Sequence, residues 1–365
     1  MTGHAYPWDV LGDPTFADRA TEAVTLAAAY HSTRAATPLH PDRQIVDARY
    51  AALYRPVREA AWQGRVLRPK APAWLDEKDP YREAAEILAD AGRRVNAWIV
   101  LTHNTRLGTH HPDLAVVNCF GEAYPYALCP AHEEVRDYAA TLAAEAVRDA
   151  PVDGISLEAC GQLGINHLGH HEKTDGAWDP DTATWLSICC CAGCRAGWGR
   201  AGLPPAQVIR SLRDAVRGGG RVSADVLDAL LANRHANTDV LRRQVLEALR
   251  AEAPGAPVTL HAHPDPWATG ASPGLTPTAA GDVDALLVPA WPTTEDSAGL
   301  VRRAAATGRP IDAYVTVLAP AEKQAIVPHV QRLAAAGASR FSVYHLGLAP
   351  RQRHDLFAVI GAAVS

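Results

Sequence analysis

Residues 135–158 read VRDYAATLAAEAVRDAPVDGISLE, and this stretch decides the fold. Its first half predicts an amphipathic helix, because apolar residues recur there at spacings of three and four: Val135, Tyr138, Ala139, Leu142 and Ala146. A proline ends the helix, and a short apolar run from Gly154 to Glu158 follows as a strand. A helix that leads directly into a strand is one unit of an alternating α/β protein.

The same order of helix, stop residue and apolar run recurs along the chain. Asp79 and Pro80 are typical of a helix N-cap and first turn, Gly92 ends that helix, and a strand follows. In all we predict eight strands, at residues 24–30, 51–55, 95–101, 154–158, 258–263, 285–289, 311–318 and 341–345. Eight such units predict an α/β fold closed into a (β/α)8 TIM barrel. An open, doubly wound sheet uses the same alternation and is the alternative.

Two long segments interrupt the pattern, at residues 102–130 after the third predicted strand and 160–205 after the fourth. Both leave from carboxyl ends of strands, where barrel enzymes carry their working loops. Residues 223–252 are predicted to form one long helix. No linker divides the chain, so we expect one barrel domain over 1–365, with 160–205 as a loop insertion.

The composition limits the classes of molecule that the protein is expected to bind. The 365 residues are 48% apolar without an apolar run long enough for a membrane span, and the first residues lack an export signal. We therefore expect a cytoplasmic protein. The net charge is -5 with both signs interspersed, which predicts a small-molecule substrate and neither nucleic acid nor membrane as a partner. The oligomeric state is left open.

Glu158 is the candidate catalytic residue. The two-residue period of a strand sends Ile155 and Leu157 to one face, and Ser156 and Glu158 to the other. The apolar pair suits the helix layer, so Glu158 is expected in the mouth of the barrel. Partial burial there would raise its pKa and suit it to general acid or base catalysis. The alternative is a carboxylate that pairs with a neighbour and holds the rim together.

Polar and aromatic side chains also stand at the exits of other predicted strands, and we expect them to bind substrate. These are His31, His103, His261, His263, Trp291, Tyr344 and His345. His261 and His263 lie on one strand face, which is compatible with a metal pair as well as with a substrate clamp. Flat aromatic faces are what a site needs to stack on sugar rings, although the same rings serve ordinary packing.

Four of the seven cysteines fall within Cys189-Cys190-Cys191-Ala192-Gly193-Cys194. This run contains Cys-x-Cys and Cys-x-x-Cys, and the second spacing lets two thiolates reach one tetrahedral zinc ion. We expect a structural zinc held by Cys189, Cys191 and Cys194, with His171 chosen as the fourth ligand from the histidines at 167, 170 and 171. Unligated thiols are the alternative.

Three segments carry a resemblance to a known family: Gly121 to Cys129, Glu134 to Tyr138, and Asp153 to Glu158. Over about 97–194 the chain resembles uncharacterised glycoside-hydrolase-like TIM-barrel proteins, among them actinobacterial proteins described only as alanine-rich or hypothetical. These proteins have a similar Cys-x-Cys-x-x-Cys knuckle after the fourth strand. The resemblance implies a sugar-like substrate and an acid role for Glu158.

The sequence departs from retaining barrel glycosidases, which carry a second glutamate at the end of the seventh strand. Here Tyr314 to Leu318 reads YVTVL without a carboxylate. We prefer Asp265 as the second catalytic carboxylate, with Glu172 and Glu122 as other choices. A glycoside hydrolase is thus the first hypothesis. A metal-dependent lyase, isomerase or hydrolase with strand-end His and Glu ligands is the second, and a non-catalytic sugar-binding barrel is the third.

Overall fold

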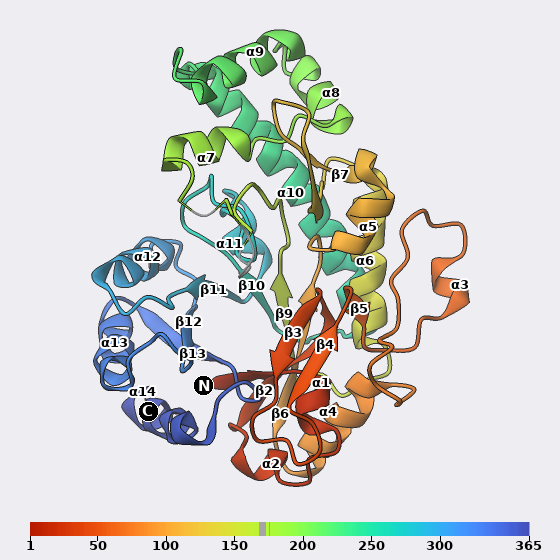
Figure 1. Ribbon diagram of the computed structural model, residues 1–365, viewed down its shortest axis with the longest axis vertical. Coiled ribbons are helices and arrows are strands. Elements are labelled where there is room, and N and C mark those ends of the chain that lie inside the picture. The colour runs from red at the N-terminus through yellow and green to blue at the C-terminus, as the bar shows by residue number, and fades with distance from the viewer. Residues whose placement is uncertain (168–172, 175, 365) are drawn as a thin grey trace.

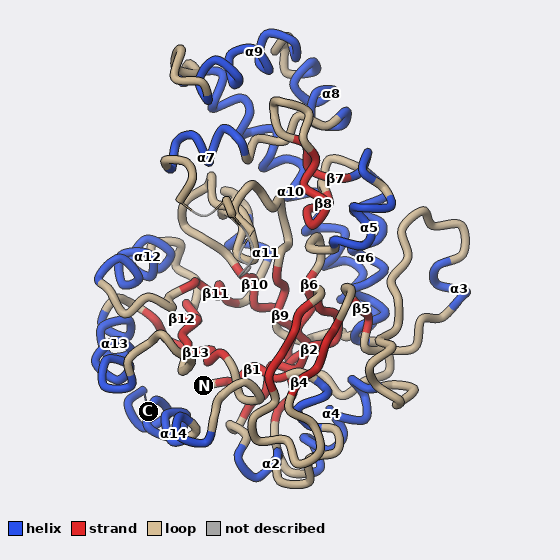
Figure 2. The backbone as a smooth tube through the Cα atoms, viewed as in Figure 1, coloured by secondary structure: helices blue, strands red, loops and turns tan. Residues whose placement is uncertain are grey.

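The computed structural model describes residues 1–167, 173–174 and 176–364. Eight parallel strands form a closed barrel, in which β1 pairs with both β2 and β13 and so joins the two ends of the sheet. Figure 2 shows these strands as a ring. The strands are β1 (Thr2–Ala5), β2 (Ala23–Tyr30), β6 (Arg94–Val100), β9 (Gly154–Glu158), β10 (Val258–His261), β11 (Ala285–Pro289), β12 (Ile311–Thr316) and β13 (Ala338–Tyr344). The predicted (β/α)8 fold is confirmed.

One predicted strand is wrong. Residues 51–55 do not form a barrel strand: only β5 (Ala52–Leu53) is extended there, and it pairs antiparallel with the end of β2. The missing strand is β1, which reads TGHA and is buried throughout. This strand has no apolar signal in the sequence, because it is only four residues long and its inward residues, Thr2 and His4, are polar.

The helices surround the barrel on its outer side. In Figure 1, α12, α13 and α14 cover one side of the ring and α4 and α6 cover another, while α8 and α9 stand at the far end of the long helix α10. The longer helices are α4 (Pro80–Asp90), α6 (Glu133–Val147), α9 (Pro205–Val216), α10 (Ala224–Glu252), α12 (Glu295–Ala305), α13 (Lys323–Ala335) and α14 (Asp355–Val364). The shorter ones are α1 (Pro7–Val10), α2 (Phe16–Arg19), α3 (Glu59–Trp62), α5 (Thr105–His110), α7 (Pro180–Leu186), α8 (Ala192–Arg200) and α11 (Ala279–Asp282), with 3-10 turns at Pro112–Leu114 and Arg351–Arg353.

Local sequence signals explain several of these elements. The Asp79 carboxylate accepts a hydrogen bond from the Arg82 backbone N–H and so caps α4, as predicted. Gly92 then ends the turn after α4 with a φ of 73°, a left-handed conformation that favours glycine. The predicted apolar stripe of α6 is buried along its whole length. In this protein, the ends of these helices are therefore set by capping residues that lie close to them in the sequence.

Two long excursions leave the barrel, one after the third strand β6 and one after the fourth strand β9. The first contains α5 and the antiparallel pair β7 (Ala115–Val117) and β8 (Ala123–Leu128). The second contains α7 and α8. A further hairpin, β3 (Thr33–Ala36) with β4 (Ile45–Ala48), follows β2. Among the described residues, no helix is long and apolar enough to cross a membrane.

Polar and aromatic side chains occupy the inside of the barrel. Hydrogen bonds cross between strands there, from the Ser342 hydroxyl to Asp312 at 2.9 Å and between Ser156 Oγ and His261 Nε2 at 2.9 Å. Branched aliphatic residues fill the interior of most barrels of this kind. A polar interior is costly to bury unless its groups are paired, which makes the inside of this barrel the candidate location of a functional site.

Candidate active site

Glu158 ends β9 and lies inside the carboxyl end of the barrel, where it is 5% exposed. Its Oε2 accepts a hydrogen bond of 2.8 Å from the Trp98 indole N–H on the neighbouring strand β6. Burial raises the pKa of Glu158 to about 7, although the Trp98 hydrogen bond acts in the opposite direction. The carboxyl group can therefore hold or release a proton near neutral pH.

His261 stands beside Glu158 on the next strand, β10. The distance between His261 Nδ1 and Glu158 Oε2 is 3.8 Å, and His261 Nδ1 makes no hydrogen bond within the described part of the chain. Burial lowers the pKa of His261 to about 3, which keeps the imidazole neutral. Whenever the Glu158 carboxyl group is protonated, the pair formed with the neutral imidazole carries no charge.

A chain of rings extends from Glu158 toward the loops after β2 and β6. Tyr30 packs on Trp98 with ring centroids 4.6 Å apart, His31 stacks on Tyr30 at 4.1 Å, and His103 stacks on His31 at 4.3 Å. The Nε2 atoms of His103 and His167 are 3.0 Å apart. The structure thus places the predicted residues His31 and His103 on one connected side of the mouth.

A second group of rings lies on the opposite side of the mouth. Trp291 packs on Tyr344 at a centroid distance of 4.9 Å and on Tyr314 at 5.7 Å, and Tyr314 lies 5.6 Å from His261. Trp291 is 40% exposed, so part of its ring faces solvent. His345 packs against Tyr344 at 4.9 Å but is fully buried. Trp291 and Tyr344 are therefore the predicted residues that a ligand would meet from this side.

Asp265 and His263 lie farther along the loop after β10. Asp265 is exposed, and its Oδ1 accepts a hydrogen bond of 2.9 Å from the Trp267 backbone N–H. His263 Nδ1 accepts one of 3.1 Å from the Asp265 backbone N–H. Neither side chain has a described contact with Glu158. The structure groups these two residues with each other in a loop turn.

Several residues near Glu158 lie on or beside β1, the strand that the sequence pattern does not reveal. His4 lies on that strand, fully buried, with its ring 4.7 Å from that of Trp98 and 6.5 Å from that of His261. Tyr6 follows the strand, and its hydroxyl group donates to Tyr30 at 3.2 Å. Trp98 lies in a predicted strand, two residues after the polar Asn96. Because side chains two residues apart share one face of a strand, this pattern could have indicated that both face the inside of the barrel.

Asp9 is the other carboxyl group with a strongly raised pKa near this end of the barrel. Burial raises its pKa to about 7, and its Oδ2 accepts a hydrogen bond of 2.8 Å from the Tyr6 backbone N–H. A Cβ atom at Gly347 would lie 2.0 Å from its carboxyl carbon. Glycine at that position lets the chain close over Asp9, so this carboxyl group is enclosed by protein and not open to a substrate.

The raised pKa of Glu158 predicts a specific pH dependence of stability. Between pH 4.5 and about 7 the folded chain holds this proton and the unfolded chain loses it. Its contribution to stability is complete below pH 4.5 and falls as the pH rises through 7, by about 3 kcal/mol in total. Glu158→Gln should remove this contribution.

Urea unfolding of both proteins at pH 4.5, 6 and 7.5 checks this expectation. The free energy of unfolding of the wild type should fall relative to that of Glu158→Gln as the pH rises. Asp9 and Asp312 also have raised pKa values, of about 7 and about 6, but both proteins contain them and their effect cancels. Parallel curves for the two proteins would contradict a raised pKa at Glu158.

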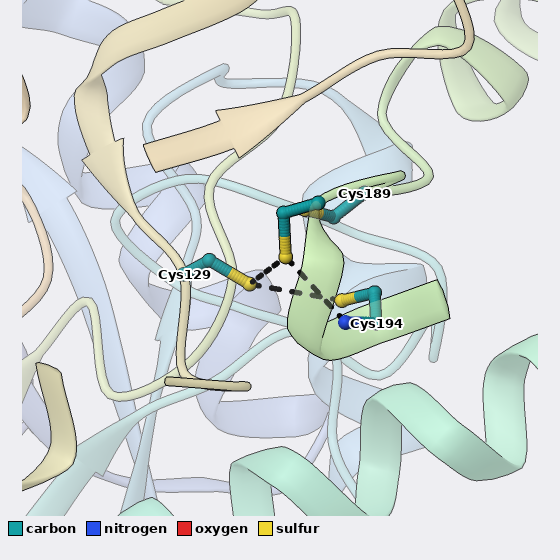
Figure 3. A group of neighbouring side chains, drawn as sticks. Cys129, Cys189 and Cys194 are labelled. Carbon is teal, nitrogen blue, oxygen red and sulfur yellow. Dashed lines mark hydrogen bonds between the residues drawn. The ribbon is translucent and has the colours of Figure 1, made fainter. Parts of the chain in front are cut away.

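Four buried cysteines form a separate cluster, Cys129, Cys189, Cys191 and Cys194, whose sulfur atoms all lie within 4.8 Å of one another. Cys129 Sγ is 3.7 Å from the Sγ atoms of both Cys194 and Cys191. Tetrahedral zinc with Zn–S bonds of 2.3 Å needs sulfur atoms about 3.8 Å apart, so this spacing fits one ion. Figure 3 shows Cys129, after β8, and Cys194, in α8, turned toward each other.

The fourth sulfur comes from a residue that the sequence analysis did not choose. The expected fourth ligand, His171, lies outside the described residues. Cys129 completes the set instead, from the first long excursion, while Cys189, Cys191 and Cys194 belong to the second. Neighbouring thiols, first that of Cys129, lower the pKa of Cys191, which favours a thiolate there. The cluster could therefore bind a metal ion that ties the two excursions together.

We compared the chain with known proteins. No family model and no curated protein sequence matches it. Among solved structures, it is similar to α-L-fucosidase isoenzyme 2 from Paenibacillus thiaminolyticus, with 15% identity, a TM-score of 0.60, and coverage of 100% of this chain and 48% of that one. It is similar to β-galactosidase from Marinomonas ef1, with 11% identity, a TM-score of 0.56, and coverage of 94% and 53%.

The chain thus spans about half the length of those two proteins. It is also similar to the catalytic domain of β-amylase from Paenibacillus polymyxa, with 12% identity and a TM-score of 0.60. In that case 99% of this chain aligns with 98% of the other. At these identities the likeness shows a shared fold, the (β/α)8 barrel found in enzymes named for the sugars they act on.

Proposed function

We propose that the protein is a glycoside-hydrolase-like enzyme acting on a sugar substrate, with Glu158 as its general acid/base. The observation that carries this proposal is the position of the Glu158 carboxyl group, which is buried at the carboxyl end of the fourth barrel strand and accepts the Trp98 hydrogen bond. Burial there raises its pKa to about 7. A group with such a pKa can protonate a leaving oxygen and take a proton back at neutral pH. The barrel fold shared with fucosidase, β-galactosidase and β-amylase structures supports the sugar substrate.

The surroundings of Glu158 fit this role. The Trp98 N–H fixes the position of one carboxylate oxygen, and His261 stays neutral beside it. No side chain of the described part of the chain pairs with Glu158 as a cation. Trp291 and Tyr344 offer flat faces at the mouth, on which the C–H groups of a sugar ring can pack. His31 and His103 would bind its hydroxyl groups from the other side.

The second carboxylate in this proposal is Asp265. Trp267 holds one of its oxygens, while Oδ2 has no hydrogen-bond partner among the described residues. An exposed carboxylate on the loop after β10 could activate a water molecule or attack the sugar. Carboxyl groups about 5 Å apart would give retention of anomeric configuration, and a gap of about 6.5 to 9.5 Å would give inversion.

Replacing Asp265 by asparagine should lower turnover by about 100-fold or more, because the reaction loses its base or nucleophile. Stability should hardly change, because the side chain is exposed. The measurement is a screen of aryl glycosides and oligosaccharides with the wild type, followed by kcat of the variant on each cleaved substrate. Asp284→Asn is the matched control, since this aspartate lies before β11. Unchanged kcat in Asp265→Asn would assign the second role to another residue.

We also propose that the four-cysteine cluster binds a structural zinc ion. Four protein ligands leave no open position for a substrate or water molecule, so the ion would hold the two long excursions together. Thiolate sulfur is a soft ligand that suits zinc. The cysteines are expected to keep their thiols in a reducing compartment, as in the cytoplasm.

A metal-dependent reaction at the barrel mouth is the second candidate. The facing Nε2 atoms of His103 and His167 favour it, because two imidazoles can hold one divalent ion in this way. Metal analysis separates the two candidates. One ion per chain, held by the cysteines, supports the glycoside hydrolase, and a second ion that is lost on His103→Ala supports metal-dependent chemistry.

A further inference from the structure

A cavity of about 310 Å³ opens at the end of the barrel opposite Glu158. It lies among the first residues of the strands, and polar side chains line much of it: Thr2, Asn96, Ser156, Thr259, Asp312 and Ser342. Small-molecule sites begin at about this volume. The amino end of such a barrel usually serves stability alone, so a polar cavity there calls for an explanation.

Asp312 is the deepest charged group of this amino-end cavity. It is 6% exposed, and its Oδ2 accepts the 2.9 Å hydrogen bond from the Ser342 hydroxyl group. Its Oδ1 is buried without a hydrogen-bond partner in the described part of the chain. A buried carboxylate oxygen without a donor is costly, and burial accordingly raises the pKa of Asp312 to about 6. A ligand hydroxyl group at this position would supply the missing donor.

The walls near Asp312 are rich in groups that both donate and accept hydrogen bonds. The hydroxyl groups of Thr2 and Thr25 are 3.0 Å apart, and the Asn96 amide lies 3.4 Å from Thr25 Oγ1. Ser156 and Thr259 add hydroxyl groups from two neighbouring strands. Such a set suits a ligand with several hydroxyl groups.

Charged side chains lie at the opening of the same cavity: Arg94, Arg340 and Asp153. The strand period places Arg340 two residues before Ser342, on the inward face of β13, and Arg340 is exposed. It forms no ion pair within the described residues, whereas Arg94, on the same rim, pairs with Glu22 at 3.1 Å. A guanidinium group is the side chain best suited to a carboxylate or phosphate. The cavity therefore combines a hydroxyl-binding floor with an anion-binding rim.

We propose that the amino-end cavity is a second ligand site, which binds a small anionic polyol. The hydroxyl groups of the ligand contact Asp312 and Ser342, and its carboxylate or phosphate contacts Arg340. The site is distinct from the mouth that contains Glu158 and does not depend on the reaction proposed there. No covalent step is involved.

Isothermal titration calorimetry on the full chain tests this proposal with four probes: glucose 6-phosphate, glucuronate, glucose and inorganic phosphate. We expect saturable binding of at least one anionic sugar, about tenfold or more tighter than binding of glucose or phosphate alone. The phosphate and carboxylate arms identify which anion the rim prefers. Failure of both anionic sugars to bind, or equal binding of inorganic phosphate, would overturn the proposal.

Variants locate the site. Arg340→Gln and Asp312→Asn should each weaken binding about tenfold, and Thr259→Leu should block it by filling the cavity. Arg200→Gln, which removes an exposed arginine from α8, and Trp291→Ala, which removes an exposed ring from the opposite mouth, should leave the affinity unchanged. Circular dichroism verifies folding, and Thr259→Leu serves as the test if Asp312→Asn does not fold. Binding lost in Trp291→Ala but kept in Arg340→Gln would place the sugar at the other mouth and refute this site without harming the proposed function.

Discussion

Glu158→Gln is expected to lower turnover of any glycoside that the wild type cleaves by about 100- to 10,000-fold, the usual contribution of a general acid. Glutamine keeps the shape of the side chain and can still accept the Trp98 hydrogen bond, but it has no acidic proton. Substrate binding should change little. The measurement is kcat and KM for the most rapidly cleaved substrate, with both proteins at pH 6 to 7.

The leaving group provides the control for this prediction. Activated aryl glycosides need little proton donation, so the loss should be smaller for them than for unactivated oligosaccharides. Glu133→Gln, which changes an exposed glutamate in the first turn of α6, is the matched substitution away from the site. A wild type without turnover on any glycoside, together with unchanged sugar affinity in Glu158→Gln, would favour a non-catalytic sugar-binding barrel instead.

Cys191→Ser is expected to have the largest effect on stability. It removes one of four ligands, so the metal content should fall from one ion per chain to nearly none, and the free energy of unfolding should fall by about 3 kcal/mol or more. Elemental analysis and urea unfolding measure the two effects. In the wild type, cobalt substitution should produce thiolate charge-transfer absorption, which the variant should lack.

Cys190→Ser is the matched control. Cys190 is adjacent in sequence and also buried, but its thiol donates to the Ile188 carbonyl at 3.5 Å and lies outside the four-sulfur cluster. This variant should keep its ion. Because the ion lies outside the proposed mouth, Cys191→Ser should affect turnover through stability alone. A wild type that binds no ion in reducing buffer would contradict the zinc proposal.

The sequence predicted most of the barrel because its helices and strands carry local signals. The apolar stripe of α6 and the caps of α4 act between residues three or four apart, so no long-range contact is needed to read them. The alternation in β9 likewise placed Glu158 on the inward face. What failed was β1, since its inward residues Thr2 and His4 lack the apolar pattern on which strand prediction depends.

The residues around each site were harder to predict, because they meet only through closure of the ring. The amino-terminal strand lies between β2 and β13, which brings His4 next to Trp98 and Tyr314 although these positions are far apart in the chain. The fourth sulfur of the cysteine cluster likewise comes from Cys129, 62 residues before Cys191. The sequence predicts Asp265 as the second carboxylate only because it follows a strand end. Its distance from Glu158 depends on how the loop folds, which the local sequence does not determine.

By itself, the sequence of this protein determined the repeating βα units, the strand ends that carry polar residues, and the cysteine knuckle, because each depends on neighbours within a few residues. Only the tertiary structure decided which strand closes the barrel, which thiol completes the cluster, and which polar groups remain unpaired in the amino-end cavity. The physical reason is that the burial of a side chain and its hydrogen bonds depend on contacts between segments that are distant in the sequence. A carboxyl group such as Glu158 or Asp312 acquires its raised pKa only when the closed ring removes it from water.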